Sequence, residues 1–436
     1  MKNKLLLFIR LLLTKNNLFN FGGGNPPAVF LITMNKKLLI LSSLFVLCML
    51  FGSCSKKHEV QVVQTYSFHT GIVDVSFRYV GYYSNDGNDG LYFIDKNRFI
   101  KTFDLSGKML DSIPLNNIIN ELALKRDKIK GEVKFAGKDF IWLDSDYKNY
   151  VSMIDRGGTV KKIIQIDSLL NDSVKNFNSY SFSLLPNANE QDFDIFRARY
   201  NAIKTEEKFK ILTFEYYEDY YNTLFKHNYF LQIKNITDPQ PEINFLAKDY
   251  LQSVSNQPFV NHSSDQYKIL NGNMFIINGN NTSIIQLWGD NFQNKKIIKI
   301  QSEHIDNKVF TPSVKEVFSD FNTTQKQYKE FESKYYRRGT VQNIFYNSKQ
   351  QKYYITAGHS LNSDEELEKY GYDLRPFSVI LYDKNFENSV EYTFEPNIYK
   401  CRNAIMTSKG LLMERKQHNI NIDNYGTQTF DLLDFK

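Results

Sequence analysis

The first candidate for a binding site is a run of two tyrosines and two arginines, Tyr335, Tyr336, Arg337 and Arg338. Aromatic rings stack on sugars or on other rings, and an arginine guanidinium pairs with a carboxylate through two parallel hydrogen bonds. The same run would also suit a helix C-terminus, where the arginines oppose the helix dipole and the tyrosines enter the core. Both interpretations place the four residues at the end of a helix.

The sequence offers little else for metal binding or catalysis. The histidines occur singly, without the close spacing of a zinc-binding helix or strand pair, at positions 58, 69, 227, 262, 304, 359 and 418. Segments 85–90 and 144–149 are rich in Asp and Asn but miss the calcium-loop register, so we interpret them as tight turns. No Gly-x-Ser-x-Gly motif is present. We therefore predict no metal site, no cofactor and no catalytic residue.

The first 53 residues have the composition of a targeting segment. They contain no acidic residue and six basic ones, which are Lys2, Lys4, Arg10, Lys15, Lys36 and Lys37. The apolar run from Leu38 to Phe51 is too short to cross a bilayer as a stable helix. A cleaved signal therefore fits better than a membrane anchor.

The residues that end this run, Leu50-Phe51-Gly52-Ser53-Cys54, resemble the lipobox of bacterial lipoproteins. The resemblance implies cleavage before Cys54 and attachment of lipid to this cysteine, which makes the membrane a partner. Phe51 stands where Leu is usual, as in the looser lipoboxes of Bacteroidetes. We predict that residues 1–33 are an over-extended gene start, 34–53 the signal peptide, 54–66 a lipidated tether and 67–436 the folded domain.

Without the leader the chain is formally neutral, because removing its six basic residues leaves 48 Lys and Arg against 48 Asp and Glu. Nothing remains of the basic surface that nucleic-acid binding requires, so we exclude nucleic acid as a partner. Cys401 is then the one cysteine besides Cys54, and its basic neighbours Lys400 and Arg402 could lower its pKa. We interpret it as a small core residue, and an intrachain disulfide is excluded.

The domain repeats a unit of short apolar strands separated by polar turns. Asp104-x-x-Gly107 and Asp155-x-x-Gly158 lie 51 residues apart in matching context. The expected strands are 91–95, 99–104 and 109–115; 140–143, 150–155 and 160–166; 193–197 and 229–233; 274–277, 283–288 and 297–300; 353–356, 379–383 and 390–394; 411–413, 419–423 and 429–433. Such a period predicts an all-β fold, a β-propeller of six blades, and residues 166–267 are long enough for a seventh.

The unit resembles those of the six-bladed, TolB-like propeller lipoproteins of Bacteroidetes, many of unknown function. The resemblance is specific where Tyr335 to Arg338 are followed by Ile344-Phe345-Tyr346 and Lys352-Tyr353-Tyr354. It implies a fold and carries no activity.

Two stretches break the β pattern and predict helical insertions. Apolar residues from Val314 to Tyr335 follow a helical period after Thr311-Pro312, and Ser363 with Glu366 forms a capping box before Gly371.

These features favour a non-catalytic binding or scaffolding protein of the cell envelope, whose partner is an envelope protein or a glycan. The alternative is a propeller hydrolase or lyase acting on glycans, with carboxylates from separate blades. Surface lipoproteins of Bacteroidetes typically carry acidic residues after the lipidated cysteine, whereas this chain has Ser55-Lys56-Lys57-His58-Glu59. We therefore expect an outer-membrane lipoprotein that faces the periplasm.

Overall fold

The chain divides into two compact units, residues 1–57 and 58–436, and the computed structural model describes residues of the second unit. The described residues are 59–72, 80–85, 88–95, 99–114, 133–136, 140–145, 150–165, 185–186, 193–198, 229–234, 242–246, 266–271, 273–277, 284–288, 294–305, 330, 333–417 and 426–436. None of the helices within these ranges is long and apolar enough to span a membrane.

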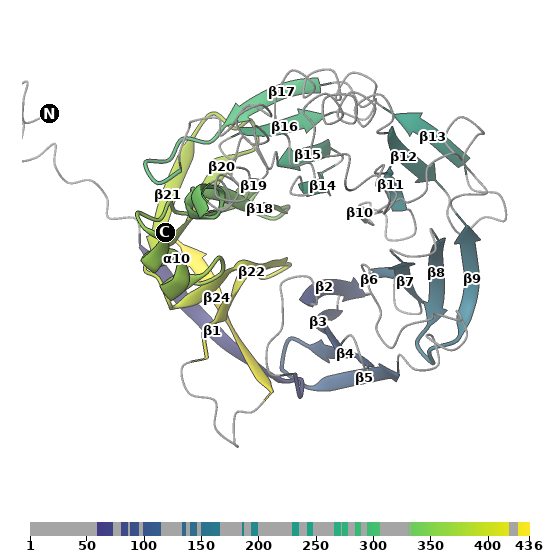
Figure 1. The fold of residues 1–436 in the computed structure, drawn as a ribbon. Coiled ribbons are helices and arrows are strands. Elements are labelled where there is room, and N and C mark those ends of the chain that lie inside the picture. Colours follow the sequence, from purple (N-terminus) through teal and green to yellow (C-terminus); the bar gives the residue numbers. More distant parts are fainter. Residues whose placement is uncertain are drawn as a thin grey trace, which may run out of the picture. The chain divides into compact units, whose positions relative to one another are not determined.

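The fold is all-β, and its described strands form six antiparallel sheets of four strands each (Figure 1). The first three sheets contain β2 (Val80–Asn85), β3 (Asn88–Asp95), β4 (Phe99–Asp104) and β5 (Met109–Pro114); β6 (Val133–Ala136), β7 (Phe140–Ser145), β8 (Tyr150–Asp155) and β9 (Val160–Gln165); and β10 (Leu185–Pro186), β11 (Phe193–Ala198), β12 (Tyr229–Lys234) and β13 (Glu242–Leu246).

The next two sheets follow the same consecutive order. They contain β14 (Gln266–Leu270), β15 (Asn273–Ile277), β16 (Ile284–Trp288) and β17 (Asn294–Lys299); and β18 (Thr340–Asn347), β19 (Lys352–Gly358), β20 (Phe377–Asp383) and β21 (Ser389–Phe394), with helix α10 (Asp364–Tyr370) between β19 and β20.

The last sheet joins the two ends of the domain. Its order is β1 (Val60–His69), β24 (Thr427–Phe435), β23 (Gly410–Arg415) and β22 (Tyr399–Thr407). β1 runs antiparallel to β24 from the pair Val60 and Phe435 to the pair His69 and Thr427. The fourth strand of this sheet therefore comes from the start of the domain, about 340 residues away along the chain from β22.

The core lies between neighbouring sheets. Phe68 of β1 contacts Phe93 of β3 and Phe430 of β24, with ring centroids 5.6 and 5.9 Å apart. A second cluster joins the β18–β21 sheet to the β22–β24 strands, and a third joins β14–β17 to β18–β21. In these clusters of described residues, neighbouring sheets bury apolar faces against one another, as a repeated strand unit requires.

The turns between the third and fourth strands of three sheets share one design. The Asp104 carboxylate accepts hydrogen bonds from the backbone N–H groups of Ser106 and Lys108, and Gly107 has φ +89°. Asp155 and Gly158 repeat this arrangement, as the spacing predicted. In a third copy, Asp383 binds three backbone N–H groups, and Phe386 takes the positive-φ position at +60°.

The structure confirms the all-β prediction and most of the expected strands. It corrects the last predicted repeat, whose three strands were all expected after residue 410. In the structure β22 is the first strand of that sheet, β24 the third, and β1 supplies the fourth. The expected strand 419–423 lies outside the described residues. The expected tether 54–66 is too long, because residues 60–66 belong to β1.

The second predicted helix is confirmed as α10. Ser363 is its N-cap, and the hydroxyl accepts a hydrogen bond from the Glu366 N–H. Gly371, with φ +58°, ends the helix through its N–H bond to the Leu367 carbonyl at 2.7 Å. Of the first insertion, only residue 330 and residues 333–337 are described, and they are helical.

Candidate functional site

One end of the β18–β21 sheet gathers the residues that the sequence singled out. The register joins Thr340 to Gly358, Gly358 to Phe377, and Phe377 to Phe394. In an antiparallel meander, the start of the first strand and the connection between the second and third lie at the same end. The helical residues 333–337 and the connection 359–376 therefore share this end of the sheet.

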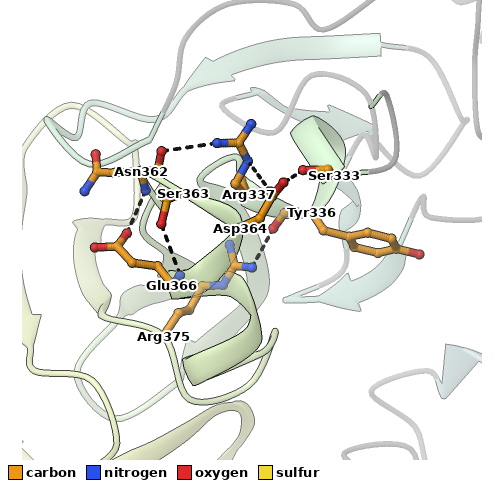
Figure 2. A network of polar contacts seen from close by, with 8 residues as sticks. All are labelled: Ser333, Tyr336, Arg337, Asn362, Ser363, Asp364, Glu366 and Arg375. Carbon is orange, nitrogen blue, oxygen red and sulfur yellow. Dashed lines mark hydrogen bonds and ion pairs between the residues drawn. The ribbon is translucent and has the colours of Figure 1, made fainter. Parts of the chain in front are cut away.

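Arg375 holds this connection in place. It has no exposed surface, and its guanidinium donates to the carbonyl of Arg338 at 3.0 Å. It also donates to the carbonyl of Tyr336 at 2.6 Å (Figure 2). A third bond of 3.3 Å reaches the carbonyl of His359. Gly358 makes room for it, because a Cβ there would lie 2.8 Å from the Arg375 Cδ. A planar guanidinium donor thus fixes three backbone positions at once.

The two arginines of the predicted cluster, Arg337 and Arg338, contact other residues of the domain. Arg337 forms an ion pair with Asp364 at the first turn of α10, with Nε 3.1 Å from Oδ1, and donates to the Asn362 carbonyl at 3.1 Å (Figure 2). Arg338 is buried, with its guanidinium carbon 3.9 Å from the centroid of the Tyr335 ring. Burial lowers the pKa of Arg338. Both arginines therefore contribute to the fold of this end of the sheet.

Tyr336 is the member of the cluster that faces outward. Its side chain is 40% exposed and points away from the polar network (Figure 2). The ring meets the rings of Tyr335 and Tyr372 edge to face, at centroid distances of 5.4 and 5.8 Å. Three tyrosines therefore form an aromatic group, which we call the tyrosine platform: Tyr335, Tyr336 and Tyr372.

Sequence reasoning missed Tyr372 and the two cations that stack on it. The guanidinium carbons of Arg375 and Arg402 lie 4.4 and 5.2 Å from the Tyr372 ring centroid. Tyr372 lies 36 residues after Tyr336 in a connection that has no motif. No local pattern could have predicted this contact.

A second group was also missed, since its members are far apart in the sequence. The ligand atoms of His304, His359 and Glu391 all lie within 4.8 Å of one another. The two imidazole rings stack at a centroid distance of 4.0 Å and an angle of 15°. Burial, helped by His304 and Arg375, lowers the pKa of His359 to about 4. His359 is therefore neutral at neutral pH.

Other sequence candidates have structural roles or lie outside the described residues. Cys401 is fully buried, and burial raises the pKa of its thiol to about 12, so the core interpretation holds. Asn85 pairs with Asn88 at the tip of the β2–β3 hairpin, which fits a tight turn. Cys54, the predicted lipidation site, lies outside the described residues.

Comparison by sequence finds no relative: no protein-family model matches the chain, and no curated protein matches it. Comparison by structure finds a DUF4221-family protein from Bacteroides vulgatus, with a TM-score of 0.57 and 12% identity over 87% of this chain and 98% of that one. This likeness shows a shared fold with an uncharacterised family.

Two further structural neighbours have lower TM-scores. One is a Bacteroides fragilis protein described as putatively exported, with a TM-score of 0.46 and 11% identity, over 86% of this chain and 95% of that one. The β-propeller domain of Swd1 from Myceliophteria thermophila has a TM-score of 0.35 and 8% identity, over 82% of this chain and 84% of that one.

Proposed function

We propose that this chain is an exported, lipid-anchored protein of the outer membrane whose six-bladed, closed β-propeller binds an envelope partner without transforming it. Closure is supported by the pairing of β1 with β24, which lets the first strand complete the last sheet. The first strand of that sheet, β22, contacts β2 on one side and β18 on the other. Blades that stack through their first strands in this way leave no sheet face uncovered.

The anchor is the lipid on Cys54, and the domain hangs into the periplasm. Residues 55–59 separate Cys54 from the first strand. An extended chain spans about 3.5 Å per residue, so this tether reaches roughly 20 Å. The domain then works close to the membrane, and its partner is an envelope protein or a glycan within that short reach.

Recognition is assigned to the tyrosine platform. The main support is that the Tyr336 ring is exposed while its own backbone carbonyl is held by a hydrogen bond from Arg375. A rigid aromatic side chain loses little conformational entropy on binding, and tyrosines are enriched among the residues that dominate binding energy. Non-catalytic binding is preferred over glycan hydrolysis because the platform presents rings rather than a pair of carboxylates.

Binding is tested with the full-length lipoprotein and a Tyr336→Ala variant on arrays of envelope glycans and by cross-linking in intact cells. Loss of a binding hot spot costs about 2 kcal/mol or more, so we expect affinity for the captured ligand to fall at least about 30-fold. Tyr370→Ala, at the end of α10 beside the exposed Lys369, is the matched control and keeps full affinity. Equal binding by both variants contradicts the proposal, and release of a shortened glycan indicates an enzyme.

Anchoring is tested separately with Cys54→Ala. We expect this variant to leave the membrane fraction after a carbonate wash, because no other segment of the mature sequence is apolar enough to hold it there. Protease added to intact cells leaves the wild-type domain uncut and degrades it after the outer membrane is permeabilised. Membrane retention of the variant, or digestion in intact cells, overturns the anchor or the orientation respectively.

A further inference from the structure

His304, His359 and Glu391 come from three separate chain segments and meet at one place. His304 follows β17, His359 follows the last residue of β19, and Glu391 lies on β21. Their ligand atoms lie within 4.8 Å of one another, and they are the one such group of three found among the described residues. Two imidazole nitrogens and a carboxylate oxygen are a ligand set that zinc sites use.

The surrounding hydrogen bonds orient these side chains. The Ser302 hydroxyl accepts a hydrogen bond from the backbone N–H of His304 at 3.1 Å and donates to Glu391 Oε1 at 2.8 Å, so one side chain links the His304 backbone to the Glu391 carboxylate. The His359 Nε2 lies 2.7 Å from the Ser378 hydroxyl, which leaves Nδ1 for another partner. Metal-binding histidines usually have their second ring nitrogen bound in this way.

The backbone around the group is fixed as well. The His359 N–H donates to the Pro376 carbonyl at 2.8 Å, and the Ser360 N–H donates to the His304 carbonyl at 3.1 Å. The segment after β17 is therefore bonded directly to the segment after β19. A site held by such contacts has little freedom to lose when a ligand binds.

The charges suit a cation. Among the described residues, Glu391 forms no ion pair with a lysine or arginine, and its carboxylate accepts a hydrogen bond from the neutral Ser302 hydroxyl. The positive charge of Arg375 disfavours a cation near His359. The Arg375 N–H groups, however, bind three carbonyl oxygens, and the negative charge of the Glu391 carboxylate offsets the charge of Arg375.

We propose that His304, His359 and Glu391 bind a divalent transition-metal ion, and that Zn²⁺ is the ion best suited to this ligand set. Ligands in a tetrahedral zinc site lie about 2.1 Å from the ion and hence about 3.4 Å from one another, so the three ligand atoms approach by roughly 1 Å on binding. The two imidazole rings also turn out of their parallel stack, because the lone pairs lie in the ring planes and must converge on one ion. A water molecule or a partner ligand takes the fourth position. The ion bridges the β14–β17 and β18–β21 sheets, and none of its three ligands belongs to the tyrosine platform.

The experiment uses the full-length protein, purified without a histidine tag, stripped with chelator and titrated with ZnCl₂ by calorimetry. We expect one Zn²⁺ per chain. His304→Ala and Glu391→Gln, both at half-buried positions, weaken binding at least about tenfold, a loss that even outer-shell partners of a metal can cause. His69→Gln, at an exposed histidine on β1, is the matched control and binds as the wild type does.

A second measurement separates the metal site from a general effect on folding. Each stripped protein is unfolded thermally with and without Zn²⁺, and Zn²⁺ raises the unfolding temperature of the wild type but not that of His304→Ala or Glu391→Gln. Co²⁺ in place of Zn²⁺ gives visible absorption bands that both variants lose. Absence of stoichiometric Zn²⁺ binding, or unchanged binding in both variants, overturns the assignment.

Discussion

The hydroxyl of Thr65 donates a 2.6 Å hydrogen bond to Oδ1 of Asp431, which joins the first strand of the domain to the last. Asp431 has no exposed surface, and its other oxygen accepts bonds from Tyr399 at 2.7 Å and Arg415 at 2.5 Å. These four residues lie on β1, β24, β22 and β23. One buried carboxylate therefore connects all four strands of the sheet that joins the two ends of the domain.

Thr65→Val tests this connection. The variant keeps the shape of the side chain but leaves Oδ1 of Asp431 without its 2.6 Å donor. A hydrogen bond to a charged group contributes about 1.5–3 kcal/mol, and we expect the free energy of unfolding in urea to fall by that amount. Thr393→Val, at an exposed position on β21, is the control and changes stability by less than about 0.5 kcal/mol. Equal stabilities of the two variants would contradict this role for Asp431.

Arg375→Met tests the support beneath the tyrosine platform. The substitution removes three hydrogen bonds to backbone carbonyls, so we expect a loss of about 3 kcal/mol or more. Arg375→Lys keeps the charge but cannot reach three carbonyls, and it should also destabilise.

Hydrogen exchange locates the effect of the Arg375 variants. Exchange should increase within residues 359–376 and around Tyr336 before the rest of the domain changes. Lys369→Met, on the exposed face of α10, serves as the comparison and leaves exchange unaltered. Uniform faster exchange throughout the domain would mean that Arg375 acts on global stability only.

The turn at Asp383 makes stability depend on pH. Backbone N–H donors, led by that of Glu387, lower the pKa of Asp383 below its ordinary value of 3.8. The stabilisation is therefore fully present above this value and is lost as the pH falls through the lower pKa of the folded state. Asp383→Asn does not titrate, so the stability difference between wild type and variant should be larger at pH 6 than at pH 3 in urea unfolding.

A milder variant of the same turn provides the control. Asn388→Ala removes one side-chain donor, whose Nδ2 lies 2.7 Å from Asp383 Oδ2, and keeps the carboxylate. The pKa of Asp383, followed by carboxyl carbon NMR, should rise in this variant toward 3.8 without reaching it. A stability difference that does not change with pH in either variant would refute the assignment.

Phe386 occupies a position where two related turns have glycine. A positive φ costs a side chain about 1–2 kcal/mol. The ring, however, stacks on Tyr353 at 4.4 Å and contacts Tyr382 at 5.5 Å. Burial of such a ring and its aromatic contacts together contribute about 2–4 kcal/mol, which exceeds the backbone cost.

Phe386→Gly should therefore destabilise the domain by about 1–2 kcal/mol in urea unfolding, although it removes the backbone strain. The reverse comparison is Gly158→Ala, at the equivalent turn with φ +85°, where a Cβ meets nothing closer than 3.5 Å. Only the backbone cost applies there, and we expect a loss of about 1 kcal/mol. A gain in stability for Phe386→Gly would show that the ring contacts contribute less than the strain.

The amino-acid sequence by itself determined the features that depend on near neighbours. Alternating apolar residues specified strands such as 99–104 and 150–155, Asp104 and Asp155 with their glycines specified turns, and Ser363 with Glu366 specified the start of α10. Each of these signals acts within a few residues, because a turn or a cap binds its own backbone.

The tertiary structure alone decided which distant residues meet. Thr65 reaches Asp431 because β1 joins the last sheet, and Arg375 binds the carbonyl of Tyr336 because two segments share one end of a sheet. His304, His359 and Glu391 come together for the same reason, across 87 residues. A single histidine or arginine carries no mark of its partner in the sequence, since side-chain contacts between strands depend on sheet order and register.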